Sequence, residues 1–206
     1  MTAPQASDGR RTRPSPGSAV VFLLVGVAVM AVALYLFGCR DPIGLRLGPC
    51  PEVASPSMLY DIERSLFGAS AIVTAIGLWM LSMVSGEMTA RVGALIFLVG
   101  AFLIFTVEAA SAAGWRILQA RSLTAGYVIL ACLGQAGVGW GLIRWMRAVG
   151  WIVVVFNLGL LVGLLVLTPN DMYFPVAHVV MPAVIAVALL VTGRSADDSS
   201  SRAATE

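Results

Sequence analysis

Long runs of apolar residues, separated by short polar segments, set the pattern of this chain. Each run is close to the ~20 residues that a helix needs to cross the ~30 Å hydrocarbon core of a bilayer. Charged residues gather at the ends of the runs rather than along amphipathic faces. The pattern predicts an all-α polytopic membrane protein, a bundle of six transmembrane helices with short loops. The six runs cover residues 19–37, 66–84, 92–112, 123–143, 148–167 and 174–191.

The segments outside these runs are polar and mostly short. Residues 1–18 and 193–206 predict disordered tails on either side of a six-span domain over residues 19–192. The longest connection, residues 38–65, contains several prolines and favours an irregular loop, with a short interfacial helix start near Tyr60. No segment is long enough for a separate catalytic domain.

Composition agrees with a membrane location. The chain is 59% hydrophobic and 12% charged, and that charged fraction is about half of the usual value for soluble domains. The formal net charge of +2 comes without a basic cluster that has interleaved aromatic residues, which argues against a nucleic-acid partner. The lipid bilayer is the expected surrounding, and a membrane-protein partner or a homo-oligomer remains open.

Arginine counts predict how the chain threads through the membrane. If the N-terminus is inside, eight of the thirteen arginines lie on the inner side and five on the outer side. The positive-inside rule then predicts a multi-pass protein of the cell membrane with cytoplasmic N- and C-termini and an extracytoplasmic loop 38–65. The inner set is Arg10, Arg11, Arg13, Arg91, Arg144, Arg147, Arg194 and Arg202, and the outer set is Arg40, Arg46, Arg64, Arg116 and Arg121.

Two of the three cysteines, Cys39 and Cys50, fall in the predicted outer loop. Disulfides persist in an oxidising compartment, so we predict a Cys39–Cys50 bridge. Free thiols, or acylation of Cys39 after a lipoprotein-like signal, are the alternatives. Cys132 lies within an apolar run and is most simply a packing residue. With one histidine in the chain and no paired Cys/His spacing, neither a metal site nor a cofactor is expected.

Four polar side chains interrupt the apolar runs: Glu108, Gln135, Asn157 and His178. Ionisable groups at membrane depth usually face the bundle interior or a water-filled cavity. Counting from the run ends places Glu108 and His178 together in the outer third of the bilayer, as a candidate protonatable site. Gln135 and Asn157 are expected near the midplane, within hydrogen-bonding reach of each other.

Each of these residues also has a purely structural interpretation. Glu108 can snorkel to the outer interface toward Arg116 or Arg121, and His178 can be a hydrogen-bonded packing residue. Gln135 and Asn157 can hold helices together, an effect worth ~0.6–2 kcal/mol. Pro182 removes the helical hydrogen bond to the His178 carbonyl, which adds a polar group at that place.

Three classes of function follow from this set. The first is a structural or accessory membrane subunit. The second is a small proton-coupled transporter that uses Glu108 and His178. The third is a lipid-modifying enzyme in which Arg116 and Arg121 hold a headgroup phosphate, and it is the weakest because no second catalytic group accompanies them. The chain has no GxSxG, HExxH or phosphate-loop motif, so an enzyme is disfavoured.

Overall fold

The computed structural model of the chain describes residues 15–40, 50, 56–115, 120–166 and 178–192. Within these ranges the chain is helical, which confirms the all-α prediction. The helices are α1 (Pro16–Arg40), α2 (Pro56–Ser85), α3 (Met88–Ala112), α4 (Ala120–Leu142), α5 (Arg147–Val166) and a final helix, His178–Thr192.

Helices α1 to α5 are long and apolar enough to cross a membrane, and the final helix is apolar but shorter. Its 15 described residues rise about 22 Å at 1.5 Å per residue, which is less than a full crossing. The predicted sixth run, residues 174–191, begins outside the described residues.

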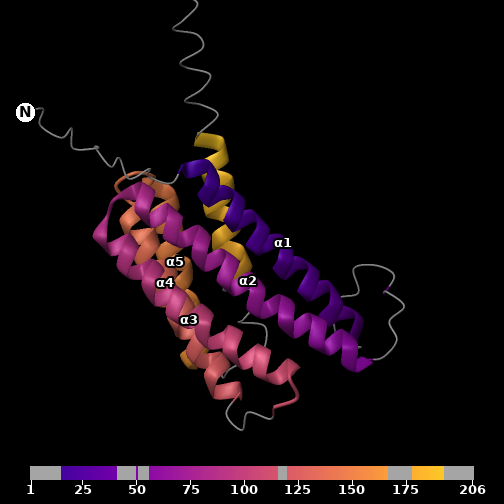
Figure 1. Ribbon diagram of the computed structural model, residues 1–206. Coiled ribbons are helices and arrows are strands. Elements are labelled where there is room, and N and C mark those ends of the chain that lie inside the picture. Colours follow the sequence, from indigo (N-terminus) through magenta and orange to yellow (C-terminus); the bar gives the residue numbers. More distant parts are fainter. Residues whose placement is uncertain (1–14, 41–49, 51–55, 116–119, 167–177, 193–206) are drawn as a thin grey trace, which may run out of the picture.

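Successive helices run antiparallel and pack in chain order, α1 on α2, α2 on α3, α3 on α4 and α4 on α5 (Figure 1). The start of α1 and the end of the final helix lie at the same end of the bundle as the α2–α3 and α4–α5 turns. We call this end the turn end. The opposite end, where α1 stops and α2 begins, is the disulfide end, because Cys39 and Cys50 lie there at disulfide distance, with their Cα atoms 5.5 Å apart.

Helix α2 begins at Pro56, ten residues before the predicted start of the second span at residue 66. The last part of the predicted loop 38–65 is therefore helical. Proline is well tolerated in the first turn of a helix, where its missing N–H is not needed. Among the charged residues that made this segment look like a loop, Arg64 pairs with the Glu108 carboxylate of α3.

Glycines allow the helices to approach closely. A Cβ on Gly93 of α3 would lie 2.5 Å from the Gly134 carbonyl oxygen of α4, and one on Gly137 would lie 2.9 Å from the Gly93 Cα. Two GxxxG patterns fall within the apolar runs, Gly137–Gly141 and Gly159–Gly163. The first packs inside the bundle, as small residues do in membrane interfaces. In the second pattern, Gly159 on α5 has nothing within 4 Å of an added Cβ.

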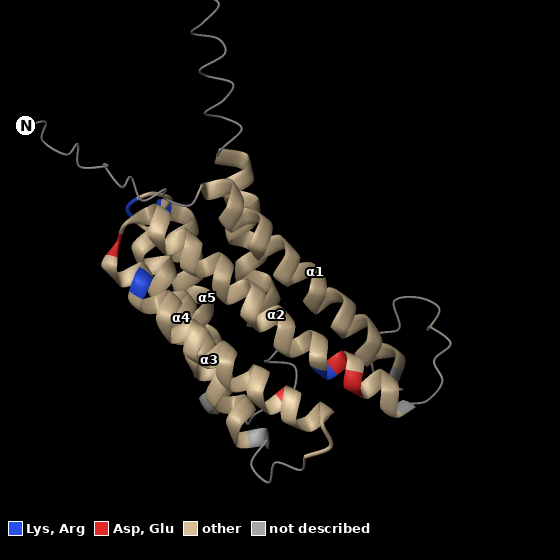
Figure 2. Cartoon of the chain, viewed as in Figure 1, with Lys and Arg blue, Asp and Glu red and all other residues tan. Residues whose placement is uncertain are grey.

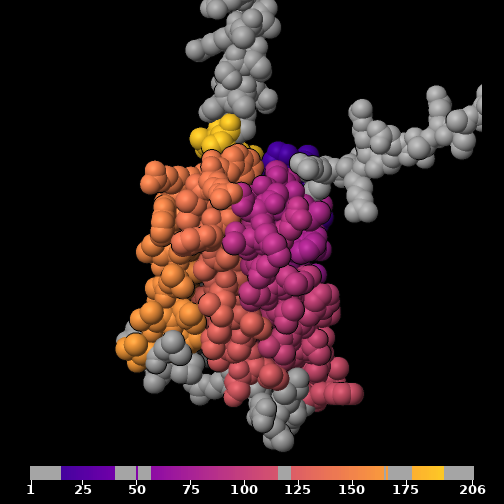
Figure 3. All heavy atoms as spheres, turned by 90° about the vertical axis from the view of Figure 1, so that its left-hand side faces the viewer, coloured from indigo at the N-terminus to yellow at the C-terminus, as the bar shows by residue number. Residues whose placement is uncertain are grey.

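The outside of the bundle is apolar between its two ends. Charged residues gather toward the ends and leave a wide uncharged zone between them (Figure 2). Large hydrophobic side chains such as Val99, Phe102 and Val155 are more than half exposed on this zone. From one side the surface is closely packed, with α4 between α3 and α5 (Figure 3). The chain is thus built as a membrane-embedded helical bundle.

Candidate functional site

His178 lies where four helices meet. Its imidazole is fully buried at the start of the described part of the final helix. Nδ1 contacts the hydroxyl of Tyr127 on α4, and Nε2 lies 3.4 Å from the Ser70 Oγ of α2. The ring also lies beside Phe97 of α3, with ring centroids 5.9 Å apart. The histidine therefore joins the final helix to α2, α3 and α4.

The hydrogen bonds around this imidazole have one consistent direction. Ser70 donates its hydroxyl hydrogen to the Phe67 carbonyl oxygen, 2.9 Å away. Its oxygen is then free to accept from Nε2, so the imidazole tautomer with its hydrogen on Nε2 fits this side. Nδ1 in turn accepts from the Tyr127 hydroxyl. The result is a chain of donors from Tyr127 through His178 and Ser70 to the Phe67 carbonyl, which we call the histidine chain.

Glu108 has a different partner from those predicted. Its Oε1 lies 3.1 Å from Nη1 of Arg64, and its side chain is 4% exposed against 31% for the arginine. The Arg64 guanidinium also lies over the Tyr60 ring, 5.0 Å from its centroid. The side chains of the predicted partners, Arg116 and Arg121, lie outside the described residues. The pair joins α2 to α3 near the disulfide end.

Glu108 and His178 lie at different levels along the bundle. Phe97, which touches His178, precedes Glu108 by eleven residues along α3. That separation is about 16 Å along the helix axis. His178 thus contacts Ser70 and Phe97 near the middles of α2 and α3, whereas Glu108 lies near the end of α3. The common depth of the two residues in the outer third of a bilayer stays a prediction. In the described part of the chain Glu108 bonds to Arg64 and not to His178.

Gln135 and Asn157 are both fully buried, on α4 and α5. The Asn157 amide nitrogen donates to the Val153 carbonyl of its own helix, 2.8 Å away. Its Oδ1 has no partner among the described residues. The predicted bond between the two amides is therefore not formed.

Three residues of these networks were not anticipated: Arg64, Ser70 and Tyr127. Arg64 was assigned to the outer loop, and Ser70 is one small polar residue within the apolar run 66–84. Tyr127 lies in the apolar run 123–143, and tyrosines of membrane helices are expected near the membrane interfaces. Of the three, only Arg64 could have been found from the sequence. The residues from Asp61 to Leu66 fit a helix that continues into the apolar run, and this places Arg64 on α2.

The described residues contain no group of three or more His, Cys, Asp or Glu side chains placed to hold a metal ion. Comparison of the chain with protein-family models, with curated proteins and with solved structures finds no match. The function must therefore be argued from these two networks and from the surface of the bundle.

Proposed function

We propose that this protein is a structural or accessory subunit of the membrane, and that its interior polar residues hold its helices in one arrangement. The histidine chain is the observation that carries this proposal. It connects α2, α4 and the final helix, and each hydrogen in it already has an acceptor. A group of this kind fixes helix positions, and its hydrogens are directed at acceptors within the protein.

The same argument weighs against Ser70 as a nucleophile. A serine nucleophile transfers its hydrogen to the neighbouring histidine. The Ser70 hydrogen is directed at the Phe67 carbonyl instead, and both side chains are fully buried. The lipid-modifying hypothesis rests on Arg116 and Arg121, whose side chains the structure does not describe, and nothing further favours it.

The accessory role is tested by purification from native membranes in a mild detergent. We expect the protein to elute as a complex with at least one other membrane protein at fixed stoichiometry. A Tyr127→Phe variant, with its histidine chain shortened, should lose part of the complex together with thermal stability. Elution of the wild-type chain as a lone monomer under all mild conditions would contradict the proposal.

A proton-coupled carrier is the second candidate. It is favoured by the depth of the buried polar groups, which extend from Arg64 and Glu108 near the disulfide end to Ser70 and His178 near the middle. The test is proton flux into liposomes that contain the protein and a pH-sensitive dye. A flux above that of empty liposomes, abolished by Glu108→Gln and kept in Glu87→Gln, would replace the accessory proposal with this one.

We also propose that the protein resides in the cell membrane with both ends in the cytoplasm, so that the turn end is the inner end. The arginine count supports this orientation. Reporter fusions at Arg194 and within residues 41–49 should give opposite signals. An external signal at Arg194 would reverse the orientation.

A further inference from the structure

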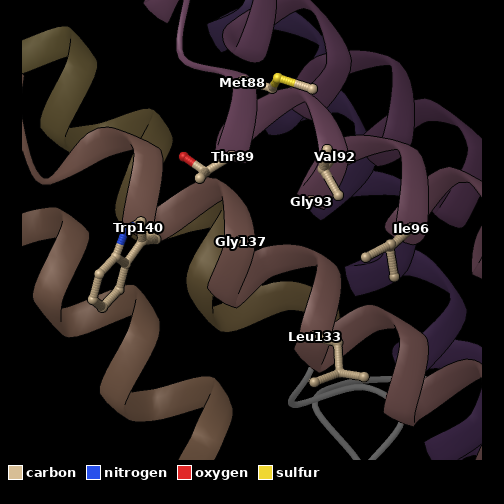
Figure 4. Close-up of a pocket in the computed structure, with 8 residues that line it drawn as sticks. All are labelled: Met88, Thr89, Val92, Gly93, Ile96, Leu133, Gly137 and Trp140. Atoms are coloured by element: carbon tan, nitrogen blue, oxygen red, sulfur yellow. The ribbon is translucent and has the colours of Figure 1, made fainter.

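A groove runs along the surface of the bundle between α3 and α4, next to the turn end (Figure 4). It has a cavity volume of about 310 Å³, within the lower range of small-molecule pockets. Its walls are Met88, Val92 and Ile96 on α3 and Leu133 and Trp140 on α4. The walls are apolar, so water is a poor occupant.

The groove exists because its floor has no side chains. Gly93 and Gly137 bring the two backbones together there, and a Cβ on Gly137 would already lie 2.9 Å from the Gly93 Cα. Along α3 the groove extends from Met88 to Ile96, about 12 Å at 1.5 Å per residue. A single leaflet supplies roughly 15 Å of hydrocarbon, half of the ~30 Å core. The groove therefore has the length of one leaflet and the width of a gap between two helices.

The positively charged side chain of Arg144 lies at the turn end of the bundle, close to this groove. Arg144 lies in the turn between α4 and α5, four residues after the groove residue Trp140. Its Nη1 lies 3.1 Å from Oε1 of Glu87, the residue directly before Met88. The Arg144 side chain is 81% exposed, and a guanidinium has five N–H donors, of which Glu87 takes one in the described structure.

Other donors lie at the same end. Thr89 on α3 and Trp140 on α4 both line the groove, and they carry a hydroxyl and an indole N–H (Figure 4). Exposed tryptophans also mark this level, since Trp79, Trp140, Trp145 and Trp151 are between 39% and 55% exposed. Tryptophan is enriched at the depth of lipid headgroups. Apolar walls thus lie at hydrocarbon depth, and the cation lies at headgroup depth.

We propose that this groove binds one phospholipid with an anionic headgroup. An acyl chain occupies the cavity between α3 and α4, and Arg144 holds the phosphate. Glu87, whose carboxylate lies 3.1 Å from Arg144, competes with the phosphate for the guanidinium. Basic residues at the inner ends of transmembrane helices select anionic lipids in this way.

The test is native mass spectrometry of the full-length protein, titrated with phosphatidylglycerol or with phosphatidylcholine of the same acyl chains. Arg144→Gln should weaken phosphatidylglycerol binding about fivefold, the effect of one arginine at the membrane surface, and leave phosphatidylcholine unchanged. Glu87→Gln should strengthen phosphatidylglycerol binding, because it removes the competitor. Val92→Trp should fill the groove and remove the bound lipid of either type.

Two variants serve as controls. Arg91→Gln removes a charge at the same end, but Arg91 projects about 100° away from Val92 around α3. Leu95→Trp adds the same bulk on an exposed position outside the groove. Val92 is itself 47% exposed, so its variant does not press on the core.

The proposal is overturned if Arg144→Gln affects both lipids equally, if Glu87→Gln leaves phosphatidylglycerol binding unchanged, or if Val92→Trp retains the lipid. It is also overturned if Val92→Trp converts a dimer to a monomer without changing the lipid count, because the occupant is then a second copy of the chain.

Discussion

The buried ion pair between Arg64 and Glu108 should stabilise the bundle far more than its exposed counterpart between Arg144 and Glu87. Both pairs have an N–O distance of 3.1 Å, but the side chains are 31% and 4% exposed in the first pair and 81% and 32% in the second. Breaking a buried pair by removing one partner costs 3–5 kcal/mol, while an exposed pair contributes about 0–1 kcal/mol. The two pairs form a matched comparison in which burial is the main difference.

Removing Arg64 and removing Glu108 should lower the free energy of unfolding by different amounts. Arg64→Met leaves the enclosed Glu108 carboxylate without its partner, and we expect a loss of about 3 kcal/mol. Glu108→Leu leaves an arginine that is partly open and can reach the interface, and we expect about 1–2 kcal/mol. The double variant removes both charges and should recover most of the loss, because an apolar pair avoids the desolvation of both ions.

Equilibrium unfolding in mixed detergent micelles measures these free energies, with each single variant and the double variant of both pairs. The expected coupling energy is at least about 2 kcal/mol for the buried pair and below about 0.5 kcal/mol for the exposed pair. Additive single costs at Arg64 and Glu108 would refute the reasoning, because the carboxylate would then not depend on the arginine.

Three further predictions concern helix contacts and the disulfide. Tyr127→Phe should lower the free energy of unfolding by about 0.6–1.7 kcal/mol, the range for interhelical hydrogen bonds in membranes. In the Tyr127→Phe background, His178→Ala should lower the free energy of unfolding by less than it does in the wild type. Gly93→Ala should disrupt the α3–α4 contact and lower the folded yield, whereas Gly159→Ala, in open space, should be neutral or stabilise by up to about 1 kcal/mol; thermal unfolding in detergent distinguishes the two, and equal effects would contradict the packing. Cys50→Ser should destabilise by up to about 3 kcal/mol through the lost loop constraint, and non-reducing peptide mapping of the wild type should recover the linked peptides.

Hydropathy was sufficient to predict the class of this fold. Long apolar runs leave few alternatives to a helical bundle, because every backbone polar group in hydrocarbon must be hydrogen-bonded within the protein. The pattern also pointed to Cys39 and Cys50 as neighbours, although Cys39 lies in the last turn of α1 and not in a loop. It failed at the start of α2, where charged residues suggested a loop. A charge belongs to a helix within the membrane when another helix supplies its partner, and Glu108 is 44 residues away from Arg64 in the sequence.

The candidate site was predicted less well, for a related reason. Sequence identified Glu108 and His178 as polar residues inside apolar runs, and both are buried. Their partners are side chains of ordinary type, such as Ser70 and Tyr127, which become special only when helices bring them to the same depth. No local pattern distinguishes such a serine from others on small-residue faces.

The sequence could not supply the position of His178 along the axis of the bundle. Counting inward from residue 174 put His178 one turn from the outer interface, on the assumption that the apolar run and the membrane crossing begin together. The contacts to Phe97 and Ser70 place it beside the middles of α2 and α3. Hydropathy measures how long an apolar run is, whereas the position of that run along the membrane normal is set by what it packs against. For the final helix those contacts include the histidine chain, which joins His178 to Tyr127 on α4 and Ser70 on α2.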